Sequence, residues 1–186
     1  MRAFLPKALG VVALGLLVAA LTVNARSIGL VKKGDKAPAV SAMGTDGKTH
    51  TLASLTKTGS VYFYFIKEGC PVNHRAAPFV TKMTGEYGEK ANLVGIYNGS
   101  VADAKKWASR YGAKYPILAD PDLKLIRSYG VPYSPFVVGV GKDGKVVEVL
   151  EGLSDKELGK LNGGLATNCS TKAIAMDYKG APSGGG

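Results

Sequence analysis

The sequence contains little cysteine and histidine: its 186 residues include only Cys70, Cys169, His50 and His74. No cysteine lies close to the end of the apolar stretch at the N-terminus, so a lipid-modified cysteine is not indicated there. Cys70 and His74 are four residues apart, but no further ligand completes a set at the spacing of a zinc site. We therefore expect neither a metal nor a cofactor.

Acidic residues are also scarce, with 14 Asp and Glu against 24 Lys and Arg, and the formal net charge is +10. Without residues 1–25, which hold two basic groups and no acidic one, the charge is 22 minus 14, or +8. The lysines are scattered singly and are not interleaved with aromatic residues, which argues against a nucleic-acid-binding protein. The charge indicates a solvated surface, with an affinity at most for anionic lipids or polymers.

Residues 1–25 are typical of a secretory signal peptide. Arg2 and Lys7 give a positive start, residues 8–23 are almost wholly apolar, and Val23-Asn24-Ala25 offers a cleavage site. The alternative is an uncleaved membrane anchor, although the apolar stretch is shorter than the roughly 20 residues that span a bilayer. In both cases we expect an extracytoplasmic protein, either periplasmic or secreted.

The remaining chain has the length of one domain with two appendages. We expect a flexible N-terminal segment over residues 26–36 and one folded domain over residues 37–170. The polar stretch 171–186 ends in Gly184-Gly185-Gly186 and is expected to be a flexible tail.

Hydrophobic patterning within the domain predicts alternating strands and helices. Residues 39–43 and 49–52 flank Asp46-Gly47, a strong hairpin signal. Further strands are expected at 61–67, 92–97, 115–118, 136–140 and 146–150, and helices at 71–87, 100–111, 122–129 and 154–165. This order predicts a mixed α/β fold, with a central sheet flanked by helices.

Cys70 lies where a buried strand is followed by the start of a helix. Pro71 suits the first helical position, and the free N–H groups and dipole of the helix N-terminus favour a thiolate, the nucleophilic form of cysteine. Lys67, His74 and Arg75 are close in sequence and are candidates for stabilising that thiolate. For His74 the alternative is an ordinary surface histidine.

Several motifs carry a resemblance to a known family. Cys70-Pro71-Val72-Asn73 is followed by Pro78, eight residues after the cysteine. Matching segments follow or precede it in the expected order: Tyr115–Asp122, Ser134–Val140, Lys142–Lys145, Gly34–Pro38 and Thr45–Lys48. Over roughly residues 34 to 152, the chain resembles the thioredoxin-like superfamily. More narrowly, it is similar to the extracytoplasmic redoxins related to alkyl hydroperoxide reductase and thiol-specific antioxidant proteins.

The resemblance implies a thioredoxin-like fold with an N-terminal β-hairpin extension, and a thiol-dependent oxidoreductase or antioxidant activity. Cys70 would be the nucleophile, and Pro135 the cis-proline of the loop that faces the substrate. Asn73 occupies the position of the second cysteine, and its amide cannot attack a sulfur atom. The implied partners are protein or small-molecule thiols and disulfides, or peroxides.

Two questions stay open from the sequence. Cys169 either forms a disulfide with Cys70, structural or catalytic, or stays free or pairs with another chain. The activity is thiol-disulfide exchange, one-cysteine peroxide reduction, or redox-inactive binding by a module that keeps only the groove. Against peroxide reduction, Lys67 and Phe63 occupy the hydroxyl and proline positions of the peroxiredoxin motif.

Overall fold

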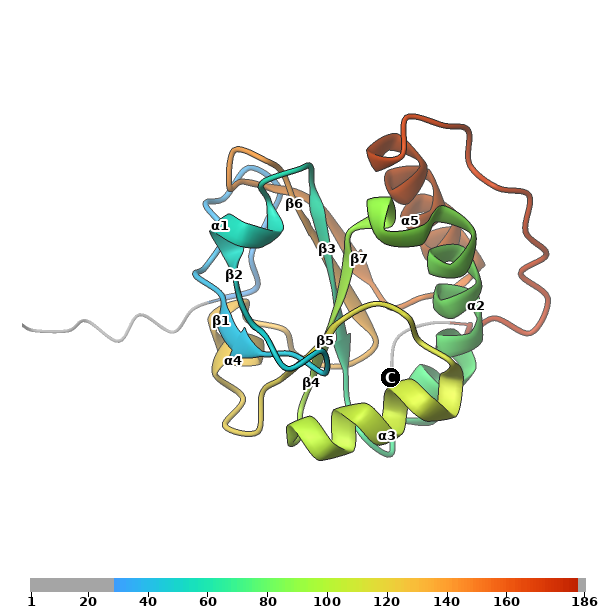
Figure 1. Cartoon of the computed structure of the whole chain (residues 1–186). Coiled ribbons are helices and arrows are strands. Elements are labelled where there is room, and N and C mark those ends of the chain that lie inside the picture. The colour runs from blue at the N-terminus through green and yellow to red at the C-terminus, as the bar shows by residue number, and fades with distance from the viewer. Residues whose placement is uncertain (1–28, 184–186) are drawn as a thin grey trace, which may run out of the picture.

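The computed structural model describes residues 29–183 as a five-stranded mixed sheet with helices on both faces (Figure 1). The sheet contains β3 (Val61–Ile66), β4 (Leu93–Tyr97), β5 (Ile117–Ala119), β6 (Phe136–Val140) and β7 (Val146–Glu151), in the order β5-β4-β3-β6-β7. The helices are α1 (Leu52–Leu55), α2 (Pro71–Tyr87), the 3₁₀ turn η1 (Gly88–Ala91), α3 (Val101–Tyr111), α4 (Lys124–Ser128) and α5 (Asp155–Asn168). The predicted α/β fold class is confirmed.

The middle strand, β3, organises the sheet. It pairs in parallel with β4 and antiparallel with β6, and all of its residues are buried. A run of aromatic and β-branched residues is suited to this place because both faces of the strand are covered. The strand therefore holds its C-terminal end, and the loop that follows it, at a fixed position.

Alternate residues of β3 belong to two separate cores. Tyr62, Tyr64 and Ile66 pack with α2, α3 and α5 on one face of the sheet. Val61, Phe63 and Phe65 pack with α1, α4 and the N-terminal segment on the other. This is the period-2 alternation of a strand, and burial of these side chains contributes about 1.5–3 kcal/mol each.

The predicted N-terminal hairpin is confirmed. β1 (Ser41–Met43) pairs antiparallel with β2 (Thr49–Thr51), and Gly47 adopts the left-handed conformation that the turn requires. The hairpin also covers the open edge of the sheet, since Gly44 bridges to Leu118 of β5. That contact protects an edge strand that would otherwise present unpaired groups.

Parts of the two segments expected to be flexible contact the folded domain where the structure describes them. Val31 is buried, and its N–H donates to the Tyr129 carbonyl at 3.2 Å. The tail over residues 171–183 packs along α2 and α5, where Asn162 donates to the Ile174 carbonyl at 2.8 Å. The flexibility of each segment stays a prediction. Residues 26–28 and 184–186 lie outside the described part.

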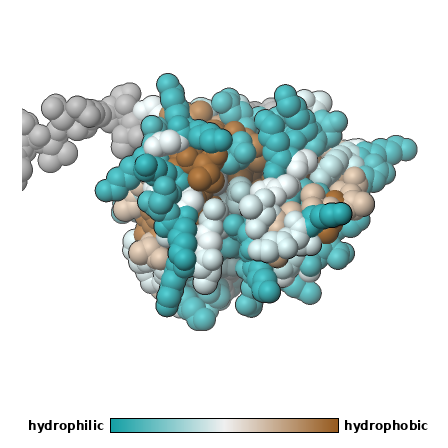
Figure 2. Space-filling model, turned by 90° about the horizontal axis from the view of Figure 1, so that it is seen from above, coloured by the Kyte–Doolittle hydropathy of each residue, from teal (hydrophilic) through white to brown (hydrophobic). Residues whose placement is uncertain are grey.

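The expected signal peptide lies outside residues 29–183. Among those residues, no helix combines the length and apolar character that a bilayer crossing requires. Seen from above, the surface is mainly hydrophilic, and its larger hydrophobic area is confined to one part of this face (Figure 2).

Candidate functional site

Cys70 stands at the N-cap position of α2, directly after the loop that ends β3. Gly69 takes a left-handed conformation in that loop, and the Glu68 N–H donates to the side-chain oxygen of Asn98 at 2.9 Å. The thiol is partly exposed, and its Sγ donates to the Ser134 carbonyl at 3.3 Å. The local structure thus presents an accessible sulfur at a helix N-terminus, as the sequence predicts.

The loop before β6 lies directly opposite this thiol. Its Ser134–Pro135 peptide bond is cis, as the sequence predicts for Pro135. Phe136, the next residue, pairs with Phe65 of β3, only five residues before Cys70. The register of β3 and β6 therefore brings together two segments that are far apart in the sequence.

Asn73, at the position of the missing second cysteine, is fully buried and fully hydrogen-bonded. Its Nδ2 donates to Ser134 Oγ at 2.7 Å and to the Lys67 carbonyl at 3.4 Å, while its Oδ1 accepts from Tyr64 at 2.9 Å. Because the Lys67 carbonyl can only accept, it fixes which side of the amide carries nitrogen. Asn73 thus binds the loops around the thiol to each other.

Ser134 completes this clamp from the other side. Its hydroxyl donates to the Phe65 carbonyl at 2.6 Å and accepts from the Lys67 N–H at 3.2 Å, besides accepting from Asn73. One donor and two acceptor positions are all that a serine hydroxyl has, so every one is used. We refer to Tyr64, Asn73 and Ser134 together as the polar clamp.

Burial determines the protonation of Tyr64 within the polar clamp. Tyr64 has no exposed surface, and this desolvation raises its pKa well above the usual value of 10.0. The neighbouring Tyr115, Cys70 and Tyr111 raise that pKa further. The phenol therefore stays protonated and keeps donating to Asn73 under ordinary conditions.

Of the three residues expected to stabilise the thiolate, His74 contacts α3 and not the Cys70 sulfur. Its ring hydrogen-bonds the Tyr111 hydroxyl and lies 5.2 Å, centroid to centroid, from Trp107 of α3. The side chains of Lys67 and Arg75 are exposed. Within residues 29–183, none of the three donates a hydrogen bond to the Cys70 sulfur, so their role stays a prediction.

The structure keeps the two cysteines apart, and both are free thiols. Cys70 precedes the first residue of α2, whereas Cys169 lies beside the carbonyl of Tyr87, the last residue of that helix. The 17 residues of α2 span about 25 Å, far more than the roughly 7 Å limit between the Cα atoms of a disulfide. The geometry does not support Cys169 as an intramolecular partner of Cys70.

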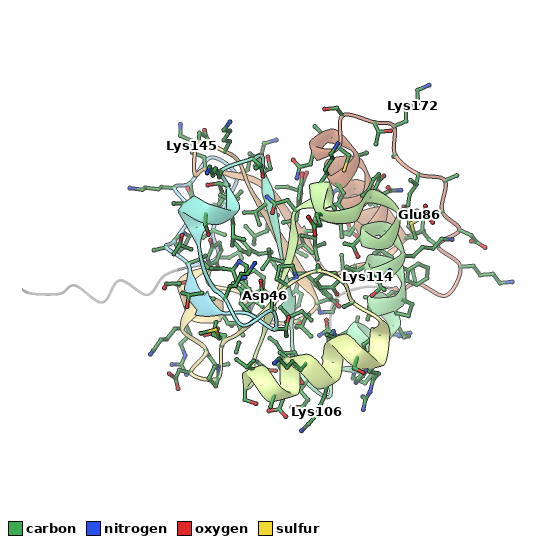
Figure 3. All side chains as sticks on the ribbon, in the orientation of Figure 1. Asp46, Glu86, Lys106, Lys114, Lys145 and Lys172 are labelled. Atoms are coloured by element: carbon green, nitrogen blue, oxygen red, sulfur yellow. The ribbon has the colours of Figure 1, made fainter. Side chains whose placement is uncertain are left out.

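An apolar cavity of about 200 Å³ lies on the α4 side of the sheet, next to Ser134, whose carbonyl contacts the thiol. It is lined by Phe65, Ile66, Lys67, Asn98, Leu123, Ile126, Val131, Pro132, Tyr133 and Ser134. A larger groove of about 690 Å³ opens at the other end of β4, and the labelled Asp46 and Lys114 line it (Figure 3). That groove includes no residue of the polar clamp, whereas the smaller cavity includes Ser134. The smaller cavity is therefore the one that adjoins the candidate site.

Sequence reasoning missed Tyr64 and Ser134 as parts of the site. Ser134 stands immediately before the expected cis-proline, and Tyr64 has the strand parity that points toward α2. Both signals were present in the sequence. Neither indicates a hydrogen bond, however, without the register that sets Ser134 against Asn73.

Among known proteins, this chain is similar in sequence to thiol-disulfide oxidoreductases. The thiol-disulfide oxidoreductase ResA of Bacillus thuringiensis (strain Al Hakam) is 30% identical over 126 residues, covering 67% of this chain and 72% of the relative. ResA of Halalkalibacterium halodurans is 27% identical over 125 residues, which are 66% of this chain and 70% of the relative.

Solved structures give the same fold. A proposed thiol:disulfide interchange protein DsbE from Chlorobium tepidum has a TM-score of 0.65 and 25% identity, covering 75% of this chain and 99% of that one. The exposed lipoprotein thioredoxin Etrx1 of Streptococcus pneumoniae has a TM-score of 0.55 and 29% identity, covering 65% and 94%. The thioredoxin-like fold is therefore confirmed.

The family model points in the same direction as the site. The description "AhpC/TSA family" matches residues 33–149, which include Cys70, the polar clamp and the cis-proline. The matched segment is more than half of the chain and agrees with the relatives above. This protein belongs to the AhpC/TSA family, within the thioredoxin-like superfamily.

Proposed function

We propose that this chain is an extracytoplasmic thiol oxidoreductase in which Cys70 is the sole attacking thiol and the partner supplies the second one. The observation that carries the proposal is the placement of Cys70 Sγ, partly exposed and 3.3 Å from the Ser134 carbonyl of the cis-proline loop. Similarity to thiol-disulfide oxidoreductases supports the same chemistry.

The reaction is an exchange that conserves electrons. The Cys70 thiolate attacks one sulfur of a partner disulfide, the partner's S–S bond breaks, and its other sulfur leaves as a thiolate. A mixed disulfide now joins Cys70 to the partner. A second thiolate, from the same partner or a small thiol, then attacks the partner's sulfur and releases Cys70.

Asn73 explains why the second thiolate has to come from outside. In a Cys-x-x-Cys protein the residue at this position resolves the mixed disulfide, but an amide cannot. The Asn73 side chain is also held by three hydrogen bonds, to Tyr64, Ser134 and the Lys67 carbonyl. The mixed disulfide therefore persists until a partner thiol arrives, which gives the protein a long-lived covalent intermediate.

The surroundings of the thiol suit a partner with an apolar group near its cysteine. The cavity of about 200 Å³ opens beside Lys67 and Ser134, and Ile126 and Val131 contribute apolar surface to its lining. A partner bonded to Cys70 lies across the Ser134 loop and can place an apolar side chain there. Burial of such a side chain stabilises the complex by about 1.5–3 kcal/mol.

Intact-mass analysis after treatment with oxidised glutathione tests the proposal. We expect one glutathione adduct, removed by reductant, that is absent in Cys70→Ser and unchanged in Cys169→Ser. An adduct confined to Cys169, or none at all, would reject the exchange function. A parallel pulse of hydrogen peroxide separates disulfide exchange from peroxide reduction, because the latter adds oxygen to the Cys70 sulfur.

Redox-inactive binding is the second candidate, and the polar clamp favours it. The clamp preserves the geometry of the cis-proline loop by hydrogen bonds alone, without any disulfide. A binding module would hold its partner equally well after Cys70→Ser. An exchange protein would lose the covalent complex with that substitution.

The extracytoplasmic location rests on residues 1–25, which have the pattern of a signal peptide. N-terminal sequencing of the protein recovered from the cell envelope or the medium tests it. A mature chain that begins at Arg26 supports the proposal. Protein found only in the cytoplasm with residues 1–25 intact contradicts it.

A further inference from the structure

Two lysines face each other directly at the end of the sheet that is far from Cys70. The backbones of Lys36 and Lys145 pair as an isolated antiparallel β-bridge. Two backbone hydrogen bonds flank it: the Gly34 N–H donates to the Val146 carbonyl at 2.8 Å, and the Ala37 N–H donates to the Gly144 carbonyl at 2.9 Å. Like charges opposite each other on paired strands are destabilising. Within residues 29–183, neither lysine forms an ion pair that would offset this repulsion.

Three further lysines extend this pair into a basic face, which we define as Lys32, Lys33, Lys36, Lys142 and Lys145. All five are exposed. The two acids among them are occupied by backbone groups: Asp35 accepts from the Lys32 N–H at 2.8 Å and Asp143 from the Lys145 N–H at 3.0 Å. Five lysines less two aspartates leave a local charge of +3.

The basic face and the thiol lie at opposite ends of the molecule. Lys145 precedes Val146, which pairs with Val140, and Val140 pairs with Val61 at the start of β3. Cys70 follows the other end of this strand, whose six residues span about 20 Å. Figure 3 shows Lys145 at the upper edge of the molecule, whereas α2 begins near the lower edge in Figure 1.

We propose that the basic face docks on an anionic phospholipid surface and so directs Cys70 away from the membrane. Five exposed lysines on two segments that are paired through their backbones match a surface of phosphate groups, since each lysine near such a surface adds about 1 kcal/mol of attraction. Neutralisation by lipid phosphate also relieves the repulsion between Lys36 and Lys145. This inference does not depend on the redox function of Cys70.

The position of the face in the chain favours lipid over a soluble polyanion. Only residues 24–28 separate the apolar stretch 8–23 from Gly29, where the described chain begins. Five residues span at most about 18 Å, so a bilayer that receives the apolar stretch lies within reach of Lys32 and Lys33. After cleavage of the signal peptide, the basic face would keep the mature chain at that surface.

Vesicle flotation with the chain from residue 26 tests the proposal, because both hydrophobic cores lie within residues 31–181. We expect binding to phosphatidylcholine vesicles that contain phosphatidylglycerol, no binding to phosphatidylcholine alone, and loss of binding at high salt. The double variant Lys36→Gln/Lys145→Gln should bind about 30-fold more weakly. Its thermal unfolding midpoint should stay the same or rise, because a repulsive pair has been removed.

The matched control is Lys105→Gln/Lys114→Gln, which removes two exposed lysines elsewhere and leaves the same net charge. We expect its vesicle binding to fall by less than threefold. Equal weakening in both variants would show that only total charge matters and would overturn the proposal. So would equal binding to neutral vesicles, or tighter binding of inorganic polyphosphate through the same lysine pair.

Discussion

Asn73 and Ser134 are joined by a hydrogen bond of 2.7 Å that connects the first turn of α2 to the cis-proline loop. The bond spans 61 positions in the sequence and lies in the protein interior, where hydrogen bonds are strong and unpaired groups are costly. Asn73 stands at the position where a thioredoxin carries its resolving thiol. Asn73 thus connects the segments around Cys70, although its amide cannot act as a resolving thiol.

Ser134→Ala should destabilise the protein by about 2–3 kcal/mol, because it leaves the part-buried Lys67 N–H and one buried Asn73 donor without a partner. Urea unfolding measures the loss. Ser128→Ala is the matched control, since that hydroxyl makes a single bond of 2.9 Å to Leu125 on part-buried α4. The control should cost about 1 kcal/mol or less. An equal loss of unfolding free energy in both variants would show that the polar clamp contributes no more to stability than a single part-buried hydrogen bond.

Alkaline pH should unfold the protein in a steep transition above pH 10. Burial raises the pKa of Tyr97 to about 12 and raises the pKa values of Tyr64, Tyr115 and Tyr129 above 10.0. The folded state then binds protons that the unfolded chain has released, so stability is complete below pH 10 and falls as pH rises. Each such tyrosine lowers the free energy of unfolding by about 1.4 kcal/mol per pH unit.

Tyrosinate absorbance and circular dichroism, recorded together, check this alkaline transition. Absorbance from the buried tyrosines should appear only as the circular dichroism signal of the fold is lost. Ionisation of all nine tyrosines near pH 10, with the fold intact, would contradict the prediction.

Much of the fold could be predicted because its signals are local. Asp46-Gly47 indicated the hairpin, the run at 61–67 indicated the central strand, which the structure has at 61–66, and Cys70-Pro71 indicated the start of α2. The cis-proline at 135 agrees with what the resemblance to thioredoxin-like proteins implies. The hairpin, the central strand and the start of α2 depend on turn chemistry or on residue spacing within one segment.

The polar clamp and the contacts of the tail could not be predicted in the same way, because they depend on contacts between distant segments. Ser134 reaches Asn73 only through the register of β6 on β3, which the sequence does not encode locally. The tail is polar in composition, yet Ile174, Met176, Tyr178 and Ala181 pack against the core. Average composition is a poor guide where a few residues supply the packing.

Tyr178→Ala should destabilise the protein by about 1–3 kcal/mol through lost packing and a lost hydrogen bond. The Tyr178 ring lies 6.2 Å from that of Phe79, centroid to centroid, and its hydroxyl accepts from Asn162 at 3.0 Å. Limited proteolysis should then cut residues 171–183 faster. Lys179→Ala, next to it and exposed, should leave both measurements unchanged. A tail that is equally protected in Tyr178→Ala would show that its packing does not matter.

Asn73→Cys should turn the single-thiol site into a dithiol site. The new sulfur stands three residues after Cys70 in the first turn of α2, at the position where a resolving thiol attacks. We expect a disulfide between residues 70 and 73 after mild oxidation, and release of the glutathione adduct without added thiol. Loss of the hydrogen bonds to Tyr64 and Ser134 should cost about 1–3 kcal/mol of stability.

Intact mass and a count of free thiols measure the outcome, with Asn73→Ser as the control for the lost amide. The serine variant should be destabilised like the cysteine variant and should keep its adduct like the parent protein. If Asn73→Cys also retains the adduct, its buried sulfur does not reach Cys70, and the absent thiol is not what stops turnover. If the adduct is released, one substitution separates this chain from an oxidoreductase that resolves its own mixed disulfide. The mixed disulfide of the parent protein then persists because residue 73 is asparagine and not cysteine.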